Sequence, residues 1–298
     1  MGTFIAVELD CDDNAQCEAG FSAVRDSVGA VDNAMSIYHP SEITRINAAA
    51  GSANFLQPIS VSTREVLAAS QTVAERSAGA FDITIKPLAE IYGFYQPKPV
   101  LQNPPDDATL LKAKDLVDFH QLHIAGDRAG LTKPGMGIDL GGIAKGFALD
   151  QAAGTLIRLG IKKFTFNFGG QILAHRMPAS IQIAHPLDAK KILLSCRIDT
   201  GSISVSAQNE RFVTQGKKRL GHLVNPRTGL SEERTLLTMV YHPQAMLADA
   251  WSTALFFSDE ASFRAISRRE GLAAYRLGAD GVVTTSRDFS AAACTRLE

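Results

Sequence analysis

The pattern of apolar and polar positions at the start of the chain predicts a strand followed by a helix. Apolar and polar residues alternate over Phe4–Leu9, which is the two-residue period of a strand at the edge of, or entry to, a sheet. Apolar side chains then recur at spacings of three and four, the period of an amphipathic helix, at Phe21, Val24, Val28, Val31 and Met35.

Three further helices are predicted from start signals and periodicity. Ser62 and Glu65 have the spacing of a capping box, and Gly79 marks the expected end of the helix that they begin. A second helix is expected to begin near Lys145 and to cover Phe147–Leu159, and a third covers Leu247–Leu255.

Strands dominate the second half of the chain. Short β-rich runs with turns between them are expected at Gln121–Ala125, Lys163–Phe168, Ser180–Ala184, Ile192–Ile198, Ser202–Ser206, Leu236–Tyr241, Ala273–Leu277 and Val282–Thr285. Ala279-Asp-Gly281 predicts a hairpin turn between the last two runs. Because most of these strands follow one another without helices, the predicted fold class is α+β, with mixed, largely antiparallel sheets and flanking helices.

Composition narrows the classes of function. The 298 residues are 45% hydrophobic and 20% charged, as in a globular protein with an ample core. A net charge of −1 argues against nucleic acid or an anionic membrane as partner. No apolar run is long enough to span a bilayer, and Met1–Asp13 lacks the basic and apolar regions of a signal peptide. The expectation is a cytoplasmic protein, or a periplasmic one if a leader was removed before residue 1.

The four cysteines show neither C-x-x-C nor zinc-site spacing. They are Cys11, Cys17, Cys196 and Cys294. We expect unpaired thiols, the alternative being a Cys11–Cys17 disulfide in an exported protein.

The segment Gly137–Gly146 carries the strongest candidate chemistry. Adjacent glycines let the backbone approach a ligand closely, and the following helix N-terminus with Lys145 suits phosphate oxygens, while Asp139 can orient a metal or a ligand hydroxyl. A Walker A loop is excluded because Ile143 follows Gly142, and a dinucleotide fingerprint fails at Leu140. A structural strand-to-helix turn is the alternative for this segment alone.

Two later segments add polar groups. Gly221–Gly229 is predicted to be a strand end and tight turn that presents His222 beside Asn225. Asp249 and Thr253 are four residues apart on one helix face, which suits a hard cation such as Mg²⁺. The alternative is that Thr253 hydrogen-bonds its own helix carbonyl while Asp249 is an ordinary acid of the first turn.

Motifs in one order along nearly the whole chain resemble the FAD:protein FMN transferase family, or ApbE-type flavin transferases. They are Met1–Phe4, Met35–Tyr38, Ser41–Asn47, Gly79–Asp82, Lys86–Leu88, Asp139–Gly146, Asn167–Gly170, His222–Gly229 and Asp249–Ala254. One departure is visible: where the family usually has a Ser-Gly pair, this chain has Ala207 in place of glycine. Motifs on both sides of the proline-rich stretch Pro97–Pro105 are expected to build one site, so this stretch is interpreted as an insertion loop within a single domain, residues 1–298.

The resemblance implies a reaction and a set of site residues. FAD would be cleaved between its phosphates, FMN attached to a threonine or serine hydroxyl of an acceptor flavoprotein, and AMP released. The implied catalytic residues are His222, as the base, and Asp249. The implied Mg²⁺ ligands are Gly142 (through its carbonyl), Asp249 and Thr253. The implied contacts to FAD are Met1, Tyr38, Ala80, Phe81, Asp82, Asp139, Lys145 and Leu223.

Two other functions are alternatives to the transferase. A Mg²⁺-dependent FAD pyrophosphatase would use water in place of the acceptor hydroxyl and release FMN and AMP. A non-enzymatic flavin-binding protein would be expected to lack Asp249, Thr253 or His222, and the sequence has all three.

Overall fold

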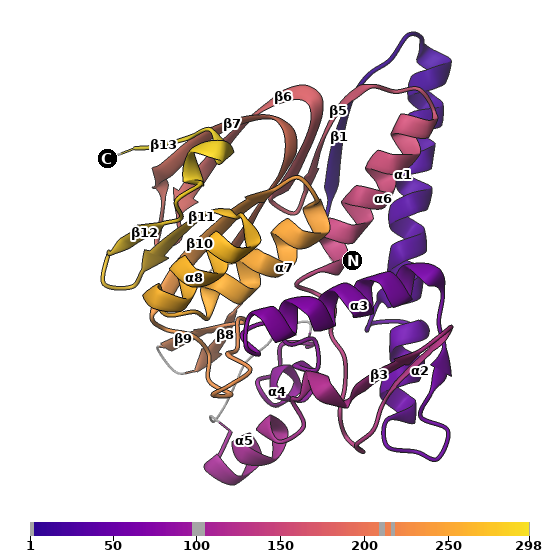
Figure 1. The fold of residues 1–298 in the computed structure, drawn as a ribbon, viewed down its shortest axis with the longest axis vertical. Coiled ribbons are helices and arrows are strands. Elements are labelled where there is room, and N and C mark those ends of the chain that lie inside the picture. Colours follow the sequence, from indigo (N-terminus) through magenta and orange to yellow (C-terminus); the bar gives the residue numbers. More distant parts are fainter. Residues whose placement is uncertain (1–2, 97–104, 209–211, 216–217, 298) are drawn as a thin grey trace.

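The computed structural model describes residues 3–96, 105–208, 212–215 and 218–297 (Figure 1). The main sheet contains eight strands, of which seven follow the order β1-β5-β6-β7-β10-β11-β12, while β13 pairs with β7. Every pairing between them is antiparallel. Their bounds are β1 Ile5–Asp10, β5 Lys163–Phe168, β6 Gln171–His185, β7 Asp188–Ala207, β10 Thr235–His242, β11 Ala273–Gly278, β12 Val283–Thr285 and β13 Cys294–Arg296.

Two smaller sheets lie outside the main one. The first has three strands in the order β2 (Gln57–Pro58), β4 (Arg128–Leu131) and β3 (Leu122–Ala125). The second pairs β8 (Phe212–Gln215) with β9 (Lys218–Gly221). Both are antiparallel, so all named strands agree with the predicted α+β class.

Some of the helices pack against the main sheet, and others lie beside the three-stranded sheet or against one another. The α-helices are α1 Asn14–Met35, α2 Glu42–Ala49, α3 Val61–Arg76, α4 Lys86–Ile91, α5 Asp107–Lys114, α6 Ala144–Arg158, α7 Ala245–Phe256 and α8 Glu260–Glu270, with short 3₁₀ turns at Phe119–Gln121 and Phe289–Ala292. In Figure 1, α1 and α6 run side by side next to β1 and β5, and α7 lies across β7 and β10 with α8 beside it. The main core fills the space between these helices and the sheet, and it includes Phe147, Phe164 and Trp251.

Several predicted elements are confirmed with shifted boundaries. The first strand is an edge strand, as expected, because β1 ends the strand order. The first helix begins at Asn14, earlier than its apolar period indicated, because Asp13 caps it by accepting a hydrogen bond from the Gln16 N–H. The hairpin at Ala279–Gly281 is confirmed by the antiparallel pairing of β11 with β12.

Three other predictions differ from the structure in their boundaries. The helix α3 begins at Val61, where Ser60 accepts from the Thr63 N–H, so the predicted capping box at Ser62 is not its start. The short strands expected at Ile192–Ile198 and Ser202–Ser206 are parts of one strand, β7, and Ser180–Ala184 lies inside the long β6. Gly201, with φ +104°, lets β7 continue where a turn was expected.

The prediction of unpaired thiols is also wrong, because all four cysteines are paired. Cys11 and Cys17 join the connection after β1 to the first turns of α1. Cys196 and Cys294 are directly opposed partners on β7 and β13, 98 residues apart in sequence. That second pairing depends on strand register, which residue spacing does not show. The predicted loop at Pro97–Pro105 lies almost wholly outside the described residues.

Candidate active site

A cavity of about 620 Å³ brings together the predicted site residues. Its walls come from the end of α1, the loops on either side of α4, the turn before α6, β7, the loop after β9 and helix α7. Among its lining residues are Tyr38, Ala80, Phe81, Asp82, Asp139, Gly142, Lys145, His222, Leu223, Asp249 and Thr253. Met1, the remaining predicted contact, lies outside the described residues.

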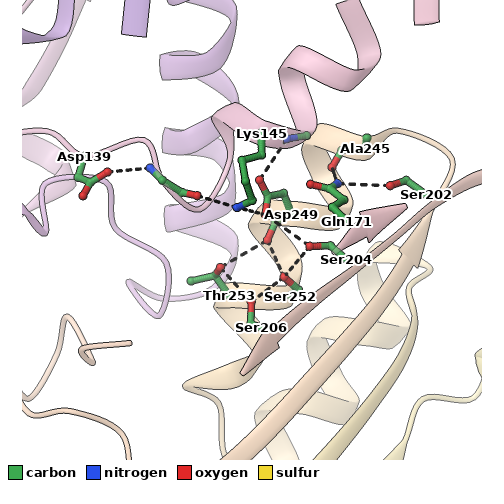
Figure 2. A network of polar contacts seen from close by, with 12 residues as sticks. Asp139, Lys145, Gln171, Ser202, Ser204, Ser206, Ala245, Asp249, Ser252 and Thr253 are labelled. Atoms are coloured by element: carbon green, nitrogen blue, oxygen red, sulfur yellow. Dashed lines mark hydrogen bonds and ion pairs between the residues drawn. The ribbon is translucent and has the colours of Figure 1, made fainter. Parts of the chain in front are cut away.

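Asp249 places a buried carboxylate at the cavity wall; the residue is 3% exposed. Its Oδ2 accepts a hydrogen bond of 3.2 Å from the Gly146 N–H at the start of α6. The Lys145 Nζ and the Ser204 hydroxyl each donate to Oδ1 at 3.4 Å (Figure 2). The carboxylate is therefore fixed by α6 on one side and approached by a cation and a hydroxyl on the other.

Thr253 lies one helical turn after Asp249 and faces the same region, as the spacing predicted. Its hydroxyl is 3.5 Å from the Asp249 carbonyl, the limit of a hydrogen bond, and 3.4 Å from the Ser206 hydroxyl. A Cβ built on Gly142 would lie 3.2 Å from both Thr253 Oγ1 and Phe81 Cε2. The backbone of the glycine turn therefore approaches the Thr253 hydroxyl closely.

The donor atoms here fit a hard cation. Within the ranges that the structure describes, no three His, Cys, Asp or Glu side chains group closely enough to hold a metal ion. Asp249 is accompanied instead by the Thr253 hydroxyl and the backbone of Gly142. One carboxylate with neutral oxygens suits Mg²⁺, which keeps waters and takes further oxygens from substrate phosphates, whereas Zn²⁺ prefers Cys and His.

Lys145 lies in the first turn of α6, where the helix N-terminus is partly positive. The N-cap residue Ile143 provides no side-chain cap for the first N–H groups. The Lys145 ammonium donates to the Gly141 carbonyl at 3.0 Å and reaches Asp249 across the turn (Figure 2). A full positive charge and the partly positive start of α6 therefore lie together beside the cavity, a combination that suits phosphate.

Asp139 is held by two donors. Its Oδ1 accepts from the Gly141 N–H at 2.8 Å, and its Oδ2 accepts from the Tyr95 hydroxyl at 2.7 Å. Burial and the Asp139 charge raise the pKa of Tyr95 well above its usual value, so the phenol stays protonated and donates. The Tyr38 ring stands edge-on to the Tyr95 ring, with 6.3 Å between the ring centroids, and Tyr38 is 58% exposed, so it is not a core aromatic.

Asp82 is buried and joins its own loop to the distant backbone at Phe119. It accepts hydrogen bonds from the Thr84 N–H, the Thr84 hydroxyl and the Phe119 N–H. Burial raises the pKa of Asp82 despite these donors. These contacts fix the path of Ala80 and Phe81 along the cavity, and a direct contact between Asp82 and a nucleotide stays a prediction.

The loop after β9 presents His222 and Leu223 to the cavity. The turn at its far end closes through Gly229, with φ +75°, whose N–H donates to the Asn225 carbonyl at 2.8 Å. The Glu232 N–H donates to the Leu223 carbonyl at 3.0 Å, which ties the returning chain to the segment that carries His222. Asn225 is buried and is not among the cavity-lining residues, so it is part of the loop's frame.

Residues 1–276 match the model of the ApbE family. The chain belongs to the ApbE family. The family prediction made from sequence is thereby confirmed.

Curated relatives of this ApbE-family chain carry the name FAD:protein FMN transferase. The protein of Klebsiella pneumoniae is 27% identical over 293 residues, which cover 94% of this chain and 83% of the relative. The protein of Escherichia coli K12 is 26% identical over 297 residues, with the same coverage.

Solved structures of the family have the same fold. Flavin transferase ApbE of Vibrio cholerae matches with a TM-score of 0.87 and 23% identity, covering 98% of this chain and 96% of that one. The flavinyl transferase ApbE of Pseudomonas stutzeri, in its apo form, matches with a TM-score of 0.82 and 26% identity over the same shares. The predicted fold class is thereby confirmed.

Three polar residues of this site were not predicted from the sequence. Ser204 and Ser206 lie on β7 and contact Asp249 and Thr253, and Tyr95 holds Asp139. The signal for the serines was present, because Ser202, Ser204 and Ser206 alternate and share one face of a strand. Tyr95 carried no such signal, since its role depends on how the segment after α4 folds back over Asp139.

Proposed function

We propose that this chain is a Mg²⁺-dependent FAD:protein FMN transferase. The supporting observation is that Asp249, Thr253, Gly142, Lys145 and His222 line one cavity although they come from separate segments of the chain. Curated relatives that match most of the chain carry the same activity in their names.

The proposed reaction follows from the groups present. The hydroxyl oxygen of a threonine or serine on an acceptor protein attacks the FMN-side phosphorus of FAD. A new phosphoester bond forms, the bond between that phosphorus and the bridging oxygen breaks, and AMP leaves. The hydroxyl proton passes to His222, since imidazole accepts protons near neutral pH.

Charge on the pyrophosphate is the main obstacle to such a transfer. Lys145 and the N-terminus of α6 would bind these oxygens. Asp249, Thr253 and the Gly142 carbonyl would hold Mg²⁺, which supplies further charge neutralisation when bound. Tyr38, Phe81, Ala80 and Leu223 provide apolar and aromatic surface for the flavin, and Met1 remains a predicted contact of the same kind.

The extent of the cavity supports treating the chain as one functional unit. Its lining residues span Thr3 to Phe257 and come from nearly the whole described chain. We therefore propose a single domain over residues 1–298. The acceptor is proposed as a protein, in line with the names of the relatives.

One assay tests the activity. Purified protein is incubated with FAD, Mg²⁺ and a candidate acceptor, which is then denatured and inspected for covalent flavin fluorescence. We expect fluorescence on the acceptor, lost when its target residue is changed to alanine. Release of FMN and AMP with no labelled acceptor would favour a pyrophosphatase, and unchanged FAD would favour a flavin-binding protein without enzymatic activity.

A further inference from the structure

Asp150 is a carboxylate outside the cavity that joins the two helices on which the site is built. It lies on α6, and both of its oxygens accept from backbone N–H groups at the start of α7. Oδ1 accepts from Ala245 at 2.8 Å, and Oδ2 accepts from Met246 at 2.9 Å. The N-cap residue of α7, Gln244, gives no side-chain cap, and Asp150 instead satisfies two N–H groups of the first turn, which have no partner within the helix.

The same crossing of α6 and α7 is unusually close. A Cβ built on Gly146 would lie 2.1 Å from the Ala245 carbonyl oxygen, so only glycine allows this approach. The Gln171 side-chain amide donates to that carbonyl at 2.8 Å (Figure 2). The residue Ala245 is therefore fixed through its N–H by Asp150 and through its carbonyl by Gln171.

Two links between the helices lie one helical turn apart. On α6, Gly146 precedes Asp150 by four residues, and on α7, Ala245 precedes Asp249 by four. One link joins the Gly146 N–H to the Asp249 carboxylate, and the other joins the Asp150 carboxylate to the Ala245 N–H. Each link constrains the other because both helices are rigid over one turn.

We propose that Asp150 is a positioning residue of the active site, which holds the start of α7 against α6 so that Asp249 and Thr253 face Gly142 and Lys145. Its role in the reaction rests on the function proposed above. Asp150 acts through the helix and touches neither FAD nor the proposed Mg²⁺ ligands.

The Gly146 amide reports on this geometry without metal or substrate. N–H groups in the first turn of a helix have no partner within the helix, and the Gly146 N–H donates to Asp249. Its hydrogen exchange, followed by NMR, therefore measures whether Asp249 stays in place. A residue that only capped α7 would affect exchange at Ala245 and Met246 and leave Gly146 unchanged.

The test compares Asp150→Ala and Asp150→Asn with a control variant that loses the N-terminal cap of a different helix. Asp13→Ala removes the cap of α1, at the end of that helix far from the cavity. In Asp150→Ala we expect Gly146 exchange to rise about tenfold and the Kd for Mg²⁺, measured by calorimetry, to rise by a similar factor. Asp150→Asn keeps one acceptor oxygen and should give a smaller change in both, and Asp13→Ala should change neither.

Unchanged Gly146 exchange in both Asp150 variants, with faster exchange confined to Ala245 and Met246, would overturn the proposal. If Asp150→Ala does not fold, Asp150→Asn decides by the same measurement. A wild-type protein that neither binds Mg²⁺ nor cleaves FAD would contradict the proposed function, whereas Gly146 exchange would still decide whether Asp150 places Asp249.

Discussion

Asp82 and Asp249 are both buried carboxylates beside the cavity, and their neighbours give them different roles. Asp82 accepts from two backbone N–H groups and the Thr84 hydroxyl, so it holds its own loop to the backbone at Phe119. Asp249 accepts from one backbone N–H and is approached by the Lys145 ammonium and the Ser204 hydroxyl. A carboxylate with polar side chains and a cation around it is the better candidate for a ligand-binding group.

His222 should affect chemistry more than binding. His222→Asn is expected to keep FAD affinity and to slow FMN transfer by about 10²–10⁴-fold, the usual contribution of a positioned acid–base group. FAD affinity is measured by quenching of flavin fluorescence, and transfer by labelling of the acceptor. His175→Asn serves as the control, since His175 stacks on Phe164 and does not line the cavity. Lost FAD affinity with unchanged turnover would make His222 a structural residue.

Asp150 gives the protein a pH dependence with a defined sign. Burial, aided by the charge of Glu65, raises the pKa of Asp150 to about 6 despite the N–H donors of Met246 and Ala245. A free aspartate titrates near 3.9, so between about pH 4 and 6 the folded state holds more protons than the unfolded state. Stability from this group is therefore present below about pH 4 and lost as pH rises to about 6.

Thermal unfolding of the wild type and Asp150→Asn, without metal, checks this dependence. The wild type should lose stability relative to the variant as pH rises from about 4.5 to about 6, with a constant difference above that. A difference between the two proteins that does not change with pH would show that Asp150 does not titrate in this range.

At the scale of elements, two glycines of α6 make a matched pair. A Cβ on Gly146 would lie 2.1 Å from the Ala245 carbonyl, whereas a Cβ on Gly154 would meet only the end of the Arg158 side chain, at 3.5 Å. Alanine favours helix over glycine by about 1 kcal/mol. Gly154→Ala should therefore be neutral or stabilising with full activity, and Gly146→Ala should separate the helices, lowering both Tm and FAD turnover.

Differential scanning calorimetry and a FAD turnover assay compare the two variants. Equal Tm and equal FAD turnover for Gly146→Ala and Gly154→Ala would show that neither stability nor activity depends on the close contact of α6 with α7.

Helices α1, α3, α6 and α7, and the face of α7 that carries Asp249 and Thr253, were predictable from sequence because they depend on local spacing, whereas α2, α4, α5 and α8 were not predicted. The four-residue interval from Asp249 to Thr253 fixes a shared helix face wherever the helix lies. The crossing of Gly146 with Ala245 was not predictable, since it depends on the tertiary placement of α6 and α7. The long strand β7 was divided in the prediction because polar residues near the Thr200–Gly201 segment resemble a turn, and only the Ser180–Ala184 part of β6 was predicted. Pairing with neighbouring strands shows that both strands continue.

At the scale of the whole molecule, a disulfide ties the C-terminal strand to the main sheet. The bond between Cys196 and Cys294 closes a segment of 98 residues, while that between Cys11 and Cys17 closes six. In the chain-entropy account, a loop of about 100 residues contributes about 4–5 kcal/mol and shorter loops contribute less. Sequence spacing could not reveal the long pair, because it forms only when β13 pairs with β7.

Replacing Cys196 and Cys294 together by alanine should therefore lower the free energy of unfolding more than replacing Cys11 and Cys17 does. Urea denaturation of the two double variants measures the difference. An equal or smaller loss for the 196–294 pair would contradict this assignment of stability.

Among the residues that the structure describes, none of the helices has the length and apolar character that a membrane span needs.

Asp249, Thr253 and Gly142 are proposed to hold a cation that FAD cleavage requires. The most direct measurement is the rate of AMP release from FAD, with acceptor present, for the wild type and for folded Asp249→Ala, in EDTA and after adding Mg²⁺. We predict that the wild type stops in EDTA and recovers with Mg²⁺, and that Asp249→Ala is inactive in both. AMP release at the wild-type rate in EDTA, or by Asp249→Ala, would contradict the proposed cation site.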